Sequence, residues 1–196
     1  MKETCVHDSL ALLWKRLLAF ALDYIVISAY LVVLVIVGVV LARTPAGPGF
    51  RALFANPNSA EATAFLLLVV PVLLYFAIFE SSHWQATWGK RVLRLRATTT
   101  SGERAGFLRA LWRNALKLLP WELTHACLWR IPGWPFDPQT PPLWINVGLI
   151  LVWVIVVVYV ISLAFSRSGQ TLYDYLAGMR IALAASIAAP DKKRIE

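Results

Sequence analysis

The chain has 196 residues, of which 59% are hydrophobic and only 15% are charged, and it contains nine tryptophans. A soluble domain carries about 25% charged residues, so the composition excludes an ordinary soluble domain and indicates an integral membrane protein. The net charge of +8 would suggest nucleic acid as a partner of a soluble chain. Here the basic residues lie beside apolar segments, so no nucleic-acid partner is predicted. The two cysteines show no paired spacing, and neither a thiolate metal site nor a cofactor is predicted.

The first predicted membrane span covers residues 14–41 and reads as an uncleaved anchor, because its apolar run exceeds that of a signal peptide. At about 1.5 Å per residue, the run 17–41 is longer than the roughly 30 Å hydrocarbon core. Asp23 lies within this run. A carboxyl group that faces lipid costs several kcal/mol. Asp23 is therefore expected to face protein or water.

The second span is predicted over residues 62–79, with Pro71 near its middle, where a kink is expected. The last span is predicted over residues 143–165, which are nearly free of polar groups.

A further span over about 106–131 is predicted from the distribution of charge, although the segment contains Pro120. Basic residues follow both the second and the last span, and basic segments beside spans lie in the cytoplasm. An even number of crossings must join two cytoplasmic segments, so one more crossing is needed before the last span. The linker 132–142 has no Lys or Arg, as an external loop should. We therefore expect four spans with both termini cytoplasmic, in the bacterial inner (plasma) membrane. The alternative is that 106–131 forms a re-entrant or interfacial helix.

Two cytoplasmic segments alternate apolar and polar residues as short strands do. These are 92–97 and 179–183, which we expect to pair as a two-stranded ribbon. The helix that begins near residue 106 carries Arg109, Arg113 and Lys117 at intervals of four, which predicts a basic stripe in the headgroup layer or a lining for an anionic ligand. The fold class is thus an all-α membrane protein of four transmembrane helices in two hairpins, with short cytoplasmic ordered segments.

Ionisable and polar side chains in or beside the spans are the candidate ligand- or ion-binding residues. The foremost candidates are Arg16, Asp23, Asp174, Glu122 and His125. The second rank comprises Glu80, His83, Gln85, Lys90 and Gln170. No catalytic or metal-binding residue is predicted.

Glu122 and His125 are three residues apart, which places them on one helical face. Two facing copies of this unit would form a di-metal site. The chain offers one copy, so a proton-handling pair, or a hydrogen bond from His125 to Glu122, is favoured.

The order of these motifs resembles the RDD family of small membrane proteins, named for one arginine and two aspartates. The matching residues are Arg16 at the start of the first span, Asp23 within it, and Asp174 in the segment 170–178, and the segment 85–91 resembles the family's link after its second helix. The resemblance covers about residues 12–182. It implies an RDD-like transmembrane domain over residues 1–182, followed by a basic cytoplasmic tail over 183–196. It also implies transport of small ligands, with sodium–proton antiport ascribed to some members.

Two functions remain open from the sequence. The first is transport-like and is coupled to a cation or proton through the intramembrane carboxylates of Asp23 and Glu122. This function requires a homo-oligomer, since four short helices leave little room for a pore. The second is a non-catalytic membrane adaptor or assembly protein whose basic cytoplasmic surface binds partners or anionic lipid headgroups. An enzyme acting on lipid, with Glu122 and His125 as acid and base, is the least favoured, because no nucleophile motif or phosphate loop accompanies them.

Overall fold

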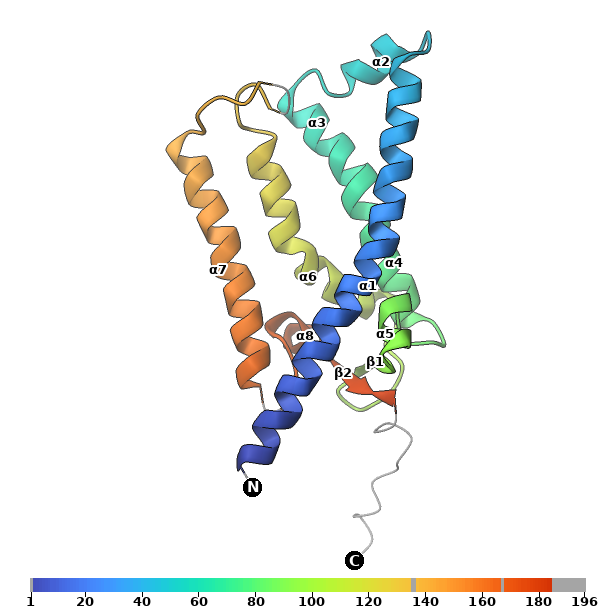
Figure 1. Cartoon of the computed structure of the whole chain (residues 1–196), viewed down its shortest axis with the longest axis vertical. Helices are drawn as coiled ribbons and strands as arrows, with labels where there is room; N and C mark the ends of the chain where they lie inside the picture. The colour runs from blue at the N-terminus through green and yellow to red at the C-terminus, as the bar shows by residue number, and fades with distance from the viewer. Residues whose placement is uncertain (1, 135–136, 167, 185–196) are drawn as a thin grey trace, which may run out of the picture. The chain divides into compact units, whose positions relative to one another are not determined.

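The protein is described by a computed structural model that covers residues 2–134, 137–166 and 168–184 and is mostly helical (Figure 1). The helices are α1 (Lys2–Ala42), α2 (Gly47–Ala52), α3 (Pro57–Ala64), the π-helix η1 (Phe65–Val69), α4 (Val70–Ser81), α5 (Trp88–Val92), α6 (Phe107–Leu128), α7 (Leu143–Phe165) and α8 (Leu172–Leu176). The strands are β1 (Leu95–Thr99) and β2 (Met179–Leu183). From residue 185 onward, the predicted basic tail lies outside the described residues.

Three of the described helical segments are long and apolar enough to cross a membrane: Leu12–Ala42, Pro57–Ser81 and Leu143–Phe165. Most of their side chains are not covered by protein, as expected of surfaces that face lipid. These helices agree with the predicted membrane class, and they correspond to three of the four predicted spans. The fourth predicted span is a single helix, α6, but it does not reach the same apolar composition. The count of four spans is therefore not confirmed.

The helix that contains Pro71 is irregular just before this proline. The π-helical segment η1 ends at Val69, and the N–H of Val70 bonds to the carbonyl of Phe65. Pro71 has no N–H to donate to the carbonyl four residues earlier, which belongs to Leu67. The Tyr30 hydroxyl donates to that carbonyl at 2.7 Å. At Pro71, where a kink was predicted, the structure has a π turn and a side-chain hydrogen bond.

Pro120 lies inside α6 and creates the same deficit. The carbonyl four residues earlier belongs to Leu116, and the Tyr159 hydroxyl donates to it at 2.7 Å. The Thr124 hydroxyl also bonds to the carbonyl of Pro120. Because these groups satisfy the backbone, α6 continues through the proline without a break.

The described chain forms two compact units. The first comprises residues 2–25, 74–116 and 158–184, and the second comprises residues 26–73 and 117–157. The helices α1, α4, α6 and α7 each contribute residues to both units. The charged side chains described below as a network all belong to the first unit.

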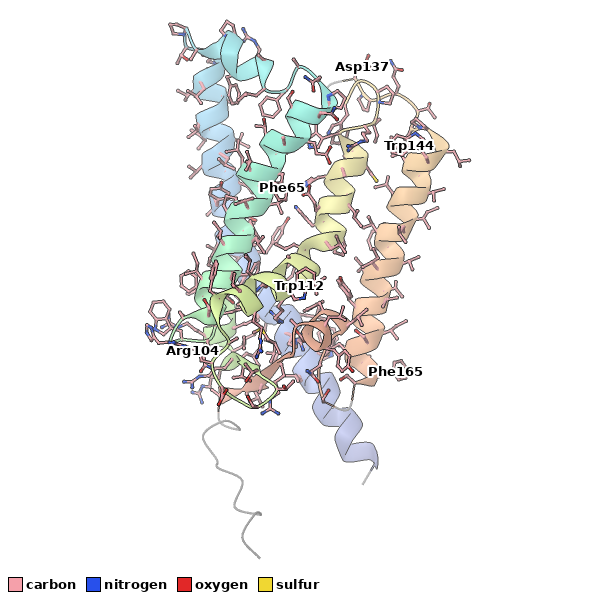
Figure 2. The ribbon with its side chains drawn as sticks, turned by 180° about the vertical axis from the view of Figure 1, so that it is seen from behind. Phe65, Arg104, Trp112, Asp137, Trp144 and Phe165 are labelled. Atoms are coloured by element: carbon pink, nitrogen blue, oxygen red, sulfur yellow. The ribbon has the colours of Figure 1, made fainter. Side chains whose placement is uncertain are left out.

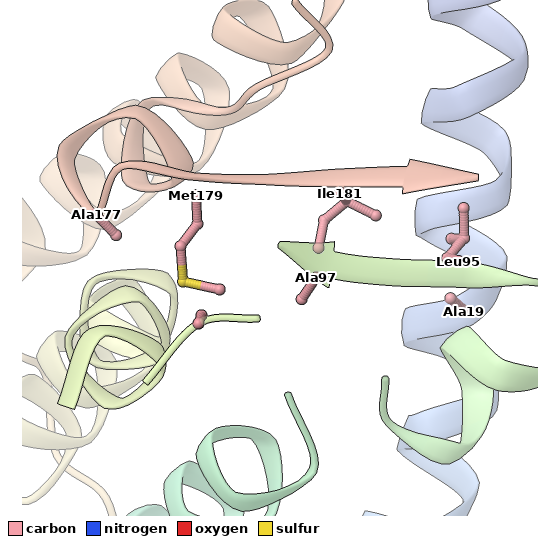
Figure 3. Close-up of a cluster of buried hydrophobic side chains, with 7 residues drawn as sticks. Ala19, Leu95, Ala97, Ala177, Met179 and Ile181 are labelled. Carbon is pink, nitrogen blue, oxygen red and sulfur yellow. The ribbon is translucent and has the colours of Figure 1, made fainter. Parts of the chain in front are cut away.

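Strands β1 and β2 form an antiparallel ribbon, in which Leu95 pairs with Leu183 and Thr99 pairs with Met179. This confirms the predicted pairing, although β1 starts later than expected. Apolar side chains of the ribbon face Ala19 of α1 and form the core of the first unit (Figure 3). The core residues are Ala19, Leu95, Ala97, Ala105, Ala177, Met179 and Ile181. The opposite face of the ribbon carries the polar residues of the alternating pattern.

Candidate functional site

Asp23 is 1% exposed and faces the protein, as predicted. Its carboxylate accepts hydrogen bonds from the Tyr75 hydroxyl at 2.9 Å, the Thr87 hydroxyl at 2.6 Å and the Gly89 N–H at 2.8 Å. All three partners are donors, which suits an ionised carboxylate. Asp23 thus joins α1 to α4 and to the first turn of α5.

Gly89 can occupy this position only because it lacks a side chain. A Cβ atom at Gly89 would lie 2.1 Å from the carbonyl oxygen of Ala19 on α1. No real contact is that short, so the α5 backbone approaches α1 more closely than any other residue type would permit.

Glu80 is 0% exposed and is held by three side chains. Arg113 donates through Nη1 to both Glu80 oxygens, at 2.8 and 3.0 Å. Asn114 donates through Nδ2 at 2.8 Å, and Lys90 forms an ion pair through Nζ. Glu80, which was predicted only in the second rank, is therefore a central acceptor of the first unit.

Asp174 is also 0% exposed and is held by two arginines. Arg16 Nη2 contacts Asp174 Oδ2 at 2.5 Å, and Arg113 contacts Oδ1 through both Nε and Nη2 at 2.7 Å. Asp174 Oδ2 also accepts the N–H of Thr171, while the Thr171 hydroxyl accepts the N–H of Asp174. This reciprocal capping box fixes the start of α8 and the carboxylate together.

We call Arg16, Glu80, Lys90, Arg113, Asn114 and Asp174 the buried charge network. Burial lowers the pKa of the Lys90 ammonium, and the Glu80 carboxylate acts in the opposite direction. Burial by itself would raise the pKa of the Asp174 carboxyl. The Arg113 and Arg16 guanidiniums outweigh burial, so this pKa lies below its ordinary value. Asp174 is therefore ionised at neutral pH.

The sequence predicted one cluster of Arg16, Asp23 and Asp174, in which one positive and two negative charges would leave room for a cation. The structure pairs Arg16 with Asp174, whereas Asp23 has its own donors. Lys90 and Arg113 add two cations, and Glu80 adds one carboxylate. Asp23 acts electrostatically on Lys90. With Asp23 included, the three cations Arg16, Lys90 and Arg113 balance three carboxylates. This group of residues therefore has no net negative charge for a bound cation to neutralise.

Arg113 and Asn114 are the network residues that the sequence interpretation missed. The four-residue interval with Arg109 placed Arg113 on a headgroup-facing stripe, which is wrong for Arg113, because its side chain is buried at 1% exposure. Arg109 is exposed, as predicted. The missed signal was Asn114, a polar residue beside Arg113 in an otherwise apolar turn of the helix.

The remaining second-rank residues make local contacts within the first unit. The His83 and Trp84 rings lie 4.4 Å apart between centroids. The carbonyl of Gln85, which adopts a φ of 53°, accepts the N–H of Ala97. Gln170 donates through Nε2 to the carbonyl of Met179 at 2.7 Å, which ties the turn after α7 to β2.

Glu122 and His125 lie in the second unit, as neighbours on one face of α6. His125 Nδ1 and Glu122 Oε2 are 3.9 Å apart, which is too far for the hydrogen bond that was one prediction. Both atoms are buried, and neither has a hydrogen-bond partner. Glu61 acts electrostatically on Glu122 and itself pairs with Arg130 at 2.7 Å. No group of three metal-ligating side chains occurs among the described residues.

Comparison with known proteins agrees with the motif order. The chain is 27% identical over 106 residues to the uncharacterized protein YxaI of Bacillus subtilis (strain 168), and the alignment covers 51% of this chain and 70% of the relative. No solved structure matches the chain. The model of the RDD family matches residues 10–178, which include Arg16, Asp23 and Asp174. The chain therefore belongs to the RDD family.

Proposed function

We propose that this membrane protein has a transport-like function, in which Glu122 and His125 bind the coupling proton or cation. The observation that carries the proposal is the pair of buried polar atoms, Glu122 Oε2 and His125 Nδ1, that have no hydrogen-bond partner. Native proteins satisfy nearly all buried polar groups, and the exceptions call for an explanation. A proton or a small cation between a carboxylate and an imidazole would satisfy both atoms.

The buried charge network has a different role in this proposal. Its carboxylates already accept from arginine, lysine and asparagine, so they hold α1, α4, α5, α6 and α8 in place. Asp23 belongs with this architectural group, because three donors from α4 and α5 already hold its carboxylate. The sequence suggested that Asp23 and Glu122 both bind the coupling cation or proton. In this proposal only Glu122 has that role.

The proposal includes α6 as a fourth span, with both termini in the cytoplasm of a bacterial inner membrane and with assembly into a homo-oligomer. The 22 residues of α6 extend about 33 Å at 1.5 Å per residue, which suffices for the hydrocarbon core. The satisfied carbonyl of Leu116 supports an intramembrane position for this helix, because unpaired backbone groups are not tolerated there.

The test is proton movement in liposomes that contain the full chain and a pH-sensitive dye. A sodium or potassium gradient is imposed, and the change in internal pH is compared with that in liposomes without protein. We expect a cation-dependent pH change with the parent and its loss with Glu122→Gln. The matched control is Glu103→Gln, because Glu103 is an exposed acid in the β1–α6 connection. No pH change with the parent, or equal change with Glu122→Gln, would refute the coupling role.

A membrane adaptor is the second candidate, and exposed arginines favour it. They lie in the first unit, at or near β1 and the start of α6: Arg91, Arg94, Arg96, Arg104 and Arg109. Such a surface attracts acidic partners or anionic headgroups. The double variant Arg96→Gln, Arg109→Gln separates the candidates, because transport through Glu122 should persist whereas adaptor binding should weaken.

A further inference from the structure

We propose that the face of the β1–β2 ribbon opposite the core is a binding site for a phosphate monoester, built by Thr98, Arg104 and Arg180. This site is independent of the transport proposal, since it lies in the first unit and shares no residue with Glu122 or His125.

The register of the strands places these three residues in one row. Thr98 pairs with Arg180 of β2 on one side and forms a bridge with Arg104 on the other. Side chains alternate between faces along a strand, and Ala97, Met179 and Ile181 face the core (Figure 3). Thr98 and Arg180 therefore point to the opposite face. Directly opposed residues have Cβ atoms about 5 Å apart, so one ligand can touch all three.

Two atoms in this row are buried and unpaired. Thr98 is 0% exposed, and its Oγ1 has no hydrogen-bond partner, nor has Nε of Arg180. A buried hydroxyl without a partner costs free energy, and so does a buried guanidinium N–H. Both groups donate, which suits an oxyanion that accepts from each of them.

The turn after β1 shapes the site. Gly102 has a φ of 90°, and a Cβ atom there would lie 3.6 Å from Arg180 Nη2, so the guanidinium lies against the turn. The Thr99 hydroxyl contacts the Ser101 hydroxyl at 2.8 Å and accepts the N–H of Glu103, which holds the turn closed. Arg104 follows in the connection between β1 and α6 (Figure 2).

The charge of the row favours a dianion. Arg96 lies two residues before Thr98 on the same face and is exposed. None of the ion pairs recorded among the described residues involves Arg96, Arg104 or Arg180. The nearby acid is Glu103, whose side chain is exposed. A phosphate monoester matches these fixed forks of donors better than a carboxylate does, because it offers three terminal oxygens.

The same phosphate could belong to a soluble molecule or to a lipid headgroup, and two assays distinguish these sources. In the first, the detergent-purified full chain is unfolded by heat in increasing inorganic phosphate, with ionic strength held constant by sodium chloride. In the second, native mass spectrometry counts phosphatidic acid against phosphatidylcholine retained by the protein. Binding in the first assay indicates a soluble ligand, and selective retention in the second indicates a lipid.

Three variants test the assignment. Arg180→Gln removes the half-buried guanidinium with its buried Nε. Thr98→Val replaces the unpaired hydroxyl with a methyl group of the same size. Arg43→Gln is the matched control, because it removes an equal charge from an exposed position outside both the row and the arginine surface of the adaptor candidate. We expect at least a tenfold loss of phosphate affinity, or of phosphatidic acid retention, with the first two and none with the control.

Thr98→Val also separates a binding role from a structural one, because removing an unpaired buried hydroxyl should not destabilise the ligand-free chain. Loss of binding without loss of unfolding temperature supports the site. Two results would overturn it: a parent that responds in neither assay, or a control that weakens binding as much as Arg180→Gln does.

Discussion

The Tyr159 hydroxyl lies 2.7 Å from the carbonyl oxygen of Leu116, the group that Pro120 leaves without a backbone donor. Tyr30 stands in the same relation to Leu67 and Pro71. In both cases a tyrosine of another long helix donates to the carbonyl four residues before a proline. These two hydrogen bonds indicate that each intrahelical proline is accompanied by a specific tyrosine donor on another helix.

Tyr159→Phe should therefore destabilise the protein by about 0.5–2 kcal/mol, since it leaves the Leu116 carbonyl unpaired. The cost should shrink in a Pro120→Ala background, because the substituted alanine would supply the backbone N–H that the proline lacks. Thermal unfolding in detergent measures the cost of Tyr159→Phe in the parent and in the Pro120→Ala background, which together form a double-mutant cycle. Tyr24→Phe is the control, since Tyr24 is exposed. Strict additivity of the two changes would contradict this account of the contact.

Arg113 and Arg109 provide a matched pair on one helix. Arg113→Lys keeps the charge but cannot reach Glu80 and Asp174 with the same forked donors. We expect a loss of roughly 3 kcal/mol or more, because a buried carboxylate would be left incompletely paired. Arg109→Lys should change the unfolding free energy by less than about 0.5 kcal/mol. Equal effects of the two substitutions would mean that the network does not stabilise the fold.

The lowered pKa of Asp174 predicts a particular dependence of stability on pH. A carboxyl group whose folded-state pKa is depressed contributes stability above its ordinary pKa of about 4 and loses it as pH falls through the folded value. The difference in unfolding temperature between the parent and Asp174→Asn should be constant near neutral pH and should narrow below about pH 4. Glu103→Gln should track the parent throughout. A difference that stays constant to pH 3 would argue against an ionised Asp174.

Asp23→Ala and Asp23→Asn should differ in severity. Alanine leaves the three donors Tyr75, Thr87 and Gly89 without an acceptor and should cost several kcal/mol. Asparagine keeps one oxygen for Tyr75 and Gly89, and its amide can donate to the Thr87 hydroxyl, which can also accept. We expect folded protein with Asn and greatly reduced yield or unfolding temperature with Ala. Similar stability of both variants would show that these hydrogen bonds matter little.

The fourth span can be tested by single cysteines in a background with Cys5 and Cys127 replaced. Thr100 and Asp137 are exposed, and they flank α6. A membrane-impermeant thiol reagent should label them from opposite sides of the membrane if α6 crosses it. Labelling of both from the same side would make α6 interfacial and would remove Glu122 from the membrane interior.

The length of the apolar runs sufficed to predict the other long helices, whereas α6 was predicted from the distribution of charge. Strand-like alternation sufficed for the β1–β2 ribbon. Asp23 was predicted to be buried because the cost of a lipid-facing carboxylate does not depend on its partners. Those partners could not be predicted, because Tyr75 and Thr87 are ordinary residues whose roles arise only when α4 and α5 pack against α1.

Arg113 shows why sequence spacing misassigned part of the site. An interval of four places Arg109, Arg113 and Lys117 on one helical stripe, but which part of that stripe is buried depends on Glu80 and Asp174. These acids lie 33 and 61 residues away in the chain. Local patterns carry no information about such distant neighbours, whereas the capping box of Thr171 and Asp174 joins residues only three apart in the chain.

The partners of Asp23 have a consequence for how the protein is made. They follow Asp23 by 52, 64 and 66 residues. At about 5–20 residues per second, the ribosome adds the last of them roughly 3–13 s after Asp23. During that interval, α1 enters the insertion machinery with a carboxyl group that none of these donors can yet satisfy. Stable residence of α1 in the bilayer therefore follows completion of α5, which makes the first helix dependent on the later chain for its own integration.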